Sequence, residues 1–352
     1  MTTPQQLVGA ILSAGLIPAL AGPPGVGKTS MCRAWAADTG RRCALIDLGP
    51  CDPTDLGGLP MLSVNGTVVR APMKLLADLA SDPSPALLVL DDLTAASPAV
   101  QAATLRLLLE RQAGDLQLGD HVALAVTYNP ADQGGLHDLE GPVAGRLVHV
   151  EVDADPGAVV AGFLGIWPTT PTFPPPADAA IAQWRRTVAG FLTVNPRQTL
   201  AESTGPAAPS PRTWDFAAQL AATVSRHGDH ELLIAVIAAA VGQGAALEFA
   251  TWHAERDLPD PAALIASPSR IRIGDTARPD RTLLVAEALT DHALRAEDPA
   301  VTETVWGLLA TAVGDGQGDL VLPAARRLTQ APRTDRPFPP AALPLLDLLG
   351  SR

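Results

Sequence analysis

The sequence predicts an α/β protein in which a parallel sheet flanked by helices is followed by a region made of helices alone. Three observations lead to this prediction. Short apolar runs alternate with helical patterns from residue 7 to residue 152, as expected when helices join the strands of a parallel sheet. The glycine-rich segment Gly22–Thr29 separates the first strand from a helix. Beyond residue 176 the strand patterns fade and helical periodicity remains.

The composition indicates a folded chain whose core has few aromatic side chains. The 352 residues are 47% hydrophobic but only 4% aromatic, so Ala, Leu and Val must build the interior. The net charge of −12 and the lack of a basic run argue against nucleic acid as the main partner. Cys32, Cys43 and Cys51 form no Cys-x-x-Cys pair, which favours free thiols in a reducing cytosol. With neither a basic leader nor a membrane-spanning run in the sequence, we expect a cytoplasmic protein without a membrane partner.

The segment Gly22–Thr29 fits the phosphate-binding pattern G-x-x-x-x-G-K-[ST]. Leu16–Ala21 is typical of a buried strand entering the loop and Ser30–Thr39 of a helix leaving it, which is the setting that the motif requires. Backbone amides then surround an anion, the lysine reaches the β- and γ-phosphates, and the hydroxyl ligates Mg²⁺. The expected nucleotide-binding residues are Gly22, Pro23, Pro24, Gly25, Val26, Gly27, Lys28, Thr29 and Ser30, and Thr29 is also an expected metal ligand.

A pair of aspartates follows a second buried strand. Ala86–Leu90 is apolar throughout, as suits a central parallel strand, and it ends at Asp91-Asp92. Downstream of a phosphate-binding loop, Asp91 is expected to hold Mg²⁺ and Asp92 to polarise the attacking water. The alternative is that the two carboxylates only cap the next turn.

Three further polar side chains are candidates for catalysis. Asn129 follows an apolar strand, where its amide could orient water beside a phosphate; an Asx turn before Pro130 is the alternative. Arg146 precedes the last strand and could donate charge to a phosphate, or it could be a solvated arginine. Arg212 opens a helix, where its charge opposes the macrodipole, so a phosphate contact and a plain surface arginine both remain open.

Turn residues predict how the connecting segments fold. Asn65-Gly66 predicts a hairpin with a type I′ turn. A second hairpin is expected around Gly119-Asp120, joining residues 116–118 to residues 122–127. Gly114 is expected to end the helix before it.

Composition also predicts how the chain divides into domains. Residues 1–155 form the α/β core, and a proline-rich linker follows at 156–180. A helical lid at 181–265 and a helical extension with a proline-rich tail at 266–352 complete the chain. His227 and His230 lack a third ligand nearby, so the segment between them is interpreted as a polar loop and not as a metal site.

Taken in order, these segments resemble the MoxR branch of the AAA+ ATPases. The resemblance covers about residues 7–250 and implies a P-loop AAA+ core followed by an all-α lid. It also implies ATP and Mg²⁺ as cofactors. The matching segments are Pro18–Thr29, Asp55–Gly58, Leu87–Asp92, Leu108–Gln112, Thr127–Pro130, Gly145-Arg146 and Ser210–Trp214.

The resemblance implies a role for each candidate residue. Lys28 and Thr29 keep the Walker A roles, and Asp91 is the Walker B carboxylate on the metal side. Asn129 corresponds to sensor 1, Arg146 to an arginine finger that acts on a neighbour's nucleotide, and Arg212 to sensor 2. The resemblance further implies a hexameric ring, a von Willebrand factor A domain partner, and the remodelling or activation of a protein client.

The chain departs from the family's pattern at Asp91-Asp92, where the family usually has Asp-Glu. Because aspartate is one methylene shorter, and misplacement by about 1 Å can cost ~100-fold in rate, we expect slow ATP hydrolysis. The segment around Arg146 also differs, reading Ala-Gly-Arg-Leu. Two other functions stay open: a nucleotide-gated binding module with little hydrolysis, and a DNA-directed motor, against which the net charge argues.

Overall fold

The structure is a computed structural model that describes residues 2–165, 168–201, 205–268, 272–330 and 337–350. Contacts within the chain define two compact units. Unit 1 consists of Met1–Ile181 and Leu200–Leu247, and unit 2 of Ala182–Thr199 and Glu248–Arg352. Parts of the predicted linker (166–167) and of the predicted tail (331–336 and 351–352) lie outside the described residues. The domain boundaries expected at 155, 180 and 265 stay a prediction.

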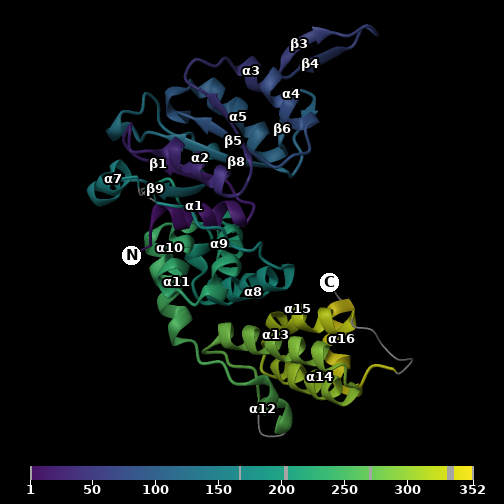
Figure 1. The fold of residues 1–352 in the computed structure, drawn as a ribbon. Coiled ribbons are helices and arrows are strands. Elements are labelled where there is room, and N and C mark those ends of the chain that lie inside the picture. The colour runs from purple at the N-terminus through teal and green to yellow at the C-terminus, as the bar shows by residue number, and fades with distance from the viewer. Residues whose placement is uncertain (1, 166–167, 202–204, 269–271, 331–336, 351–352) are drawn as a thin grey trace. The chain divides into compact units, whose positions relative to one another are not determined.

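A five-stranded parallel sheet forms the centre of unit 1 (Figure 1), which confirms the predicted fold class. All neighbouring strands run parallel. Strands β1, β5 and β8 are buried over almost their whole length, in keeping with their apolar sequences. The strand order is β2-β5-β8-β1-β9, with β1 at Pro18–Ala21, β2 at Arg42–Asp47, β5 at Ala86–Asp91, β8 at Val122–Tyr128 and β9 at Val148–Glu151.

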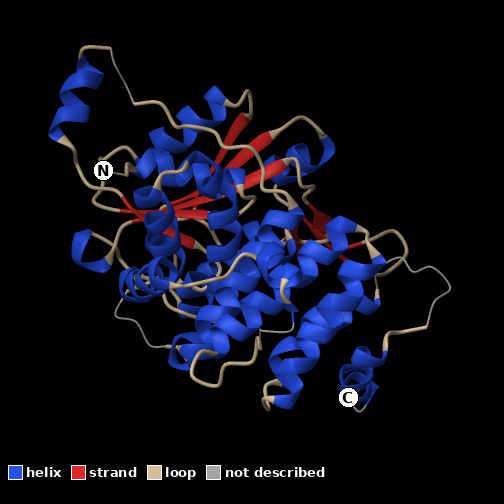
Figure 2. Cartoon of the chain, turned by 90° about the horizontal axis from the view of Figure 1, so that it is seen from below, coloured by secondary structure: helices blue, strands red, loops and turns tan. Residues whose placement is uncertain are grey.

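Helices cover both faces of this sheet (Figure 2). One face packs against α3 (Pro53–Gly57), α4 (Lys74–Ser81) and α5 (Pro98–Glu110), which bury most of their leucines on it. The other face is covered by α1 (Pro4–Ser13) and α2 (Lys28–Asp38). The predicted helices and strands of the first 110 residues are therefore confirmed in type, with shifts of a few residues at their ends.

The predicted hairpin at Asn65-Gly66 exists, but its turn is not of type I′. Strands β3 (Leu59–Leu62) and β4 (Val68–Ala71) pair in antiparallel fashion and extend away from the main sheet (Figure 1). Gly66 has a φ of 77°, whereas Asn65 keeps a negative φ. The amide of Gly66 donates to the Ser63 carbonyl at 3.0 Å, so the loop is a turn followed by a glycine bulge. The hairpin's exposed apolar side chains are Leu59, Met61, Leu62, Val64, Val68 and Val69.

The second predicted hairpin is wrong. The short strand β7 (Leu116–Gln117) pairs with β6 (Gln112–Ala113), because β8 is apolar on both faces and is used by the main sheet. Gly114 has a φ of 60° and lies in the turn between β6 and β7. Helix α5 ends earlier than expected, at Glu110. Arg111 takes the left-handed conformation there, and its guanidinium donates to the Gly119 carbonyl at 3.0 Å.

The remaining elements of unit 1 join the sheet to two long helices. Helices α9 (Pro211–Val224) and α10 (His230–Val241) pack on each other and on α1. Residues 171–173 of the predicted linker lie against α1, where a Cβ on Gly9 would approach the Pro171 carbonyl oxygen to 1.9 Å. The shorter elements are η1 (Leu93–Ala95), η2 (Ala131–Gln133), α6 (Gly141–Ala144), α7 (Pro156–Phe163) and η4 (Ser225–His227).

Unit 2 is built from helices. Its core encloses Trp306 and leucines of α13, α14, α15 and α16. The helical character expected for this part of the chain is found, and α16 lies in the stretch expected to be a proline-rich tail. Arg186 and Arg327 form ion pairs with the carboxylates of Glu287 and Asp291, which join α8, α13 and α15. The elements, of which α8 and α11 begin in unit 1, are α8 (Asp178–Val194), η3 (Pro196–Thr199), α11 (Gln243–Glu255), α12 (Pro261–Ala266), α13 (Pro279–Ala296), α14 (Pro299–Gly314), α15 (Gly318–Thr329), η6 (Pro340–Ala342) and α16 (Leu343–Gly350).

Within the described ranges, no helix combines the length and the apolar character that crossing a membrane requires. Cys32, Cys43 and Cys51 are all free.

Candidate active site

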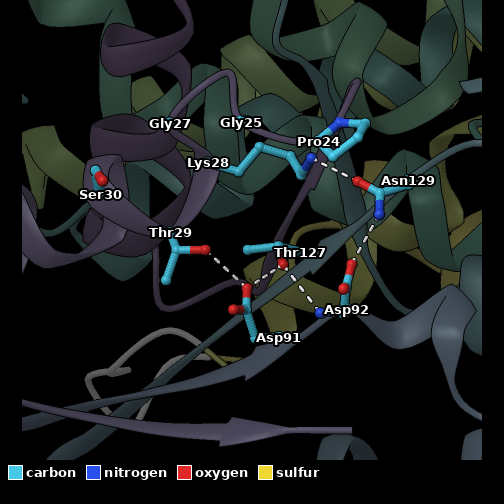
Figure 3. A pocket seen from close by; sticks show the side chains of 10 residues that line it. All are labelled: Pro24, Gly25, Gly27, Lys28, Thr29, Ser30, Asp91, Asp92, Thr127 and Asn129. Carbon is cyan, nitrogen blue, oxygen red and sulfur yellow. Dashed lines mark hydrogen bonds between the residues drawn. The ribbon is translucent and has the colours of Figure 1, made fainter. Parts of the chain in front are cut away.

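A cavity of about 290 Å³ lies at the carboxyl edge of the sheet of unit 1, where β1, β5 and β8 end (Figure 3). It brings together six of the nine predicted nucleotide-binding residues with both aspartates and the asparagine. Gly22, Pro23 and Val26 do not line it. The lining residues are Pro24, Gly25, Gly27, Lys28, Thr29, Ser30, Asp91, Asp92, Thr127 and Asn129.

The loop before α2 has the conformation that its glycines permit. Gly25 and Gly27 have φ values of 86° and 96°, which side-chain-bearing residues rarely adopt. A Cβ on Gly22 would lie 2.1 Å from the carbonyl oxygen of Val152, so only glycine fits where the loop leaves β1. Because the helix N-cap is Gly27, no side chain caps the first turn of α2, and its amides remain available to an anion in the cavity.

Lys28 is almost completely buried, with 7% of its surface exposed. Its ammonium donates to the Gly22 carbonyl at 2.7 Å, to the Pro23 carbonyl at 2.9 Å and to Asn129 Oδ1 at 2.8 Å. Burial lowers the pKa of Lys28, and the nearby carboxylates of Asp92 and Asp91 oppose that shift. The lysine is therefore held at the cavity wall by neutral acceptors, which a phosphate oxygen can replace.

Asn129 connects the lysine to the second aspartate. Its Nδ2 donates to Asp92 Oδ1 at 2.9 Å while its Oδ1 accepts from Lys28, and only this orientation of the amide satisfies both neighbours (Figure 3). The backbone of Asn129 is fixed by the hydroxyl of Thr94, which donates to its carbonyl at 2.7 Å. The Asn129 side chain thus faces the cavity instead of closing a turn at Pro130.

Asp92 has an unusual backbone conformation that directs its carboxylate. Its φ and ψ are 59° and 46°, in the left-handed region that aspartate and asparagine tolerate better than other residues with side chains. The Asp92 amide donates to Thr127 Oγ1 at 3.2 Å. The carboxylate turns toward Asn129 as a result, and it does not cap η1.

Asp91 lies beside the hydroxyl of Thr29 and fits a magnesium site. Thr29 Oγ1 donates to Asp91 Oδ1 at 2.8 Å, and Thr127 Oγ1 also donates to that oxygen. A hydroxyl and a carboxylate are oxygen ligands of the kind that Mg²⁺ takes, and the ion usually keeps several waters besides. The donor set therefore suits a hydrated magnesium ion bound to a nucleotide.

Two threonines of this site were missing from the sequence-based set of functional residues. Thr127 bonds to both aspartates, and Thr94 fixes Asn129. Thr127 is the only polar residue between Val122 and Tyr128, and such an interruption of an apolar strand was a usable signal. Thr94 carried no comparable signal, because its role depends on a contact with a residue 35 positions away.

Arg146 and Arg212 lie together, apart from the cavity. Arg212 Nη1 donates to the Gly145 carbonyl at 3.3 Å, and Arg146 Nη1 donates to the Pro142 carbonyl. Burial, and to a lesser extent the charge of Arg212, lowers the pKa of Arg146. Arg146 lies just before β9, whose first residue, Val148, pairs with Pro18, the first residue of β1. Arg146 and Arg212, which bonds to Gly145, therefore lie at the amino edge of the sheet, where the strands begin.

Comparisons with known proteins agree with this site. Residues 18–133 match the family described as "ATPase family associated with various cellular activities (AAA)". None of the curated proteins matches the chain.

Solved structures with similarity to the chain include a candidate ATPase from Cytophaga hutchinsonii, with 15% identity and a TM-score of 0.43; 68% of this chain and 80% of that one are covered. Another is a full-length MCM homologue from Methanopyrus kandleri, with 17% identity and a TM-score of 0.37 over 71% of this chain. The chain spans 53% of the length of that homologue. The segment that matches the family, residues 18–133, includes the loop, both aspartates and Asn129, and the match implies nucleotide binding.

Proposed function

We propose that this chain hydrolyses ATP in the cavity of unit 1. The observation that carries the proposal is the bonded series Lys28–Asn129–Asp92 beside Thr29 and Asp91. A cation, an amide and a carboxylate therefore lie along one wall, and groups of these kinds are what phosphoryl transfer to water needs.

Each residue has a distinct task in this proposal. The amides at the start of α2 and the Lys28 ammonium bind the phosphates, while Thr29 and Asp91 hold Mg²⁺. The metal neutralises charge that develops on the phosphate oxygens. Asn129 and Asp92 hold the attacking water, and Asp92 accepts its proton.

The two arginines support a proposal that the chain acts as an oligomer. Strand β1 has four residues, about 13 Å of extended chain, and it separates the loop from the edge where Arg146 and Arg212 lie. Among the described residues neither arginine forms an ion pair with a carboxylate. We infer that they contact a nucleotide bound by a neighbouring copy, as in a ring of the MoxR type, which the sequence resemblance suggests to be hexameric.

The cellular role follows from the resemblance and from one feature of the surface. A MoxR-type ATPase would remodel or activate a protein client, together with a von Willebrand factor A domain partner. The exposed, uncharged segment Leu59–Val69 in β3 and β4 supports a protein client better than a nucleic acid.

A nucleotide-gated binding module is the second candidate function, and Asp92 favours it. The carboxylate of Asp92 is already bonded to Asn129, and its side chain is one methylene shorter than the family's usual glutamate. Such a chain would bind ATP and assemble while it hydrolyses the nucleotide very slowly.

Phosphate release by the wild type and by Lys28→Ala tests the proposed function. We expect the wild type to release phosphate from ATP in the presence of Mg²⁺ and the variant to lose both turnover and tight ATP binding. Thr39→Ala, which lies at the far end of α2, is the matched control and should leave both unchanged. Equal turnover of wild type and Lys28→Ala would refute the proposal, and ATP binding without turnover would favour the second candidate.

A further inference from the structure

A buried tyrosine and a buried histidine span the sheet of unit 1 between the cavity and the two arginines. Tyr128 is the only tyrosine of the chain, and it directly precedes Asn129. Its hydroxyl lies 3.2 Å from His149 Nδ1, and the two rings meet edge to face with centroids 6.2 Å apart. Both side chains are buried, with 4% and 7% of their surfaces exposed. They belong to β8 and β9, which do not pair with each other.

The small residues of β1 make this contact possible. In the register of the sheet, Ala21 pairs with Tyr128 and Ala19 pairs with His149, so all four side chains share one face. A larger residue at either alanine would occupy the space that the tyrosine crosses. The arrangement thus depends on four positions in three strands, which are adjacent in Figure 1.

The histidine continues the connection to the arginine segment. His149 Nε2 lies 3.0 Å from the carbonyl of Ala144, the residue that ends α6 and precedes Gly145 and Arg146. Burial lowers the pKa of His149 to about 4, so the imidazole is neutral at physiological pH and carries one proton. Because a carbonyl only accepts, that proton is on Nε2, and Nδ1 accepts from the tyrosine hydroxyl.

The polar groups of this pair need a purpose other than stability. Phenylalanine and leucine would fill similar space on a face that is otherwise mostly aliphatic, and buried polar pairs rarely stabilise more than apolar groups of the same shape. What the hydrogen bonds add is a fixed orientation. The carbonyl of Ala144 is held at a defined position, and the next carbonyl, of Gly145, accepts from Arg212.

We propose that Tyr128 and His149 are positioning residues. They fix the position of the Gly145-Arg146 segment, and with it that of Arg212, relative to Asn129. The inference deepens the proposed function and rests on it, because the arginines must act on a nucleotide for their placement to affect turnover. A change at Asn129 on nucleotide binding is then transmitted to the arginine edge through Tyr128, His149 and Ala144. Neither residue touches ATP itself.

A double-mutant cycle between Tyr128→Phe and Arg146→Ala tests the proposal. We expect Tyr128→Phe to lower kcat for ATP about tenfold, with KM and the dissociation constant of ATP unchanged within twofold. In the Arg146→Ala background the same change should alter kcat less than twofold, because its effect passes through that arginine. His121→Gln is the control, since His121 also bonds to a carbonyl, that of Leu79, outside this connection.

His149→Gln serves as the second variant, because the glutamine amide can donate to the Ala144 carbonyl but has no acceptor at the position of the imidazole Nδ1 that faces Tyr128. His149→Gln should lower kcat to the same extent as Tyr128→Phe. If thermal unfolding shows that Tyr128→Phe does not fold, His149→Gln takes its place in the cycle. Equal losses in both backgrounds would reduce the pair to core packing and overturn the proposal, as would an undiminished kcat. No turnover by the wild type would contradict the proposed function itself, and an Arg146→Ala variant as active as the wild type would refute both the arginine role and this inference.

Discussion

The charged residues at the two edges of the five-stranded sheet differ in the groups to which they are hydrogen-bonded. At the carboxyl edge, Lys28 and Asp92 both bond to the same asparagine side chain. At the amino edge, burial and then the charge of nearby Arg212 lower the pKa of Arg146, and the hydrogen bonds of both arginines go to backbone carbonyls. The Nε of Arg146 is buried without a hydrogen-bond partner among the described residues.

The comparison shows that the charged residues of the carboxyl edge find side-chain partners within one chain, whereas among the described residues the two arginines of the amino edge do not. The charged side chains of the cavity, Lys28, Asp91 and Asp92, are all hydrogen-bonded within the chain, so the cavity is organised before a nucleotide arrives. At the amino edge, Arg146 and Arg212 are neighbouring cations that bond only to neutral carbonyls, and Arg146 Nε has no acceptor among the described residues. An anion bound there would be stabilised by both charges. Since the cavity of the same chain lies beyond β1, the proposed source of this anion is a nucleotide bound by a neighbouring copy.

The largest expected effect comes from removing an arginine of the amino edge. Arg146→Ala should lower ATP turnover by about 1000-fold, the lower range for an arginine that stabilises the transferring phosphoryl group, and leave ATP affinity unchanged. Turnover and equilibrium binding of ATP measure the two effects. Arg226→Ala, at an exposed position of η4, is the control and should change neither.

Mixing two inactive variants separates action on the same chain from action on a neighbour. Lys28→Ala retains its arginines and Arg146→Ala retains its cavity, so mixed oligomers should regain turnover that neither variant has alone. A mixture as inactive as its components would show that the two edges do not serve different subunits.

A smaller effect is expected from the Asp92 carboxylate at the carboxyl edge. Asp92→Asn should lower turnover roughly 100-fold, the lower range for the loss of a general base, while ATP binding is retained. Asparagine is the matched substitution because it tolerates the left-handed backbone and can still accept from Asn129. Single-turnover hydrolysis measures the change, and a loss below about threefold would mean that Asp92 is not the base.

Asp92→Glu then separates side-chain length from backbone conformation. If the missing methylene limits the wild type, glutamate should raise turnover. If the backbone at 92 sets the position of the carboxylate, glutamate should lower turnover, because it is less suited to a φ of 59°.

The carboxyl edge could be predicted from the sequence largely because its residues follow local signals. The glycine loop and Asp91-Asp92 each end an apolar run, and parallel strands bring such ends together. The amino edge could not be predicted in this way. Arg212 contacts Gly145, which lies 67 residues earlier in the chain. Tyr128 reaches His149 across β1, the strand that lies between β8 and β9.

The errors in the predicted fold also come from contacts between residues that are distant in the sequence. Gly114 and Gly119-Asp120 are valid turn signals, but they do not say which strands pair. Strand β8 pairs with β5 along one edge and with β1 along the other, so neither edge is available to β7. The early end of α5 was decided by Arg111, whose side chain bonds to two carbonyls beyond the hairpin.

The smallest expected effect concerns the histidine between the two edges and appears as a pH dependence of stability. Unfolded histidine has a pKa of about 6.5, whereas burial lowers the pKa of His149 to about 4 in the folded chain. The unfolded state therefore binds a proton at a higher pH than the folded state. The free energy of unfolding should be constant above pH 6.5, fall as the pH decreases toward 4, and level off below that value.

Between pH 7 and pH 5 this single group should cost about 2 kcal/mol of the free energy of unfolding, because each pKa unit corresponds to about 1.4 kcal/mol. Urea denaturation of the wild type and His149→Gln at both pH values isolates the effect, since the other titrating groups are common to the two chains. The wild type should lose about 2 kcal/mol more than the variant over this range. A difference near zero would mean that folding does not lower the pKa of His149, which would contradict the buried neutral imidazole that accepts from Tyr128.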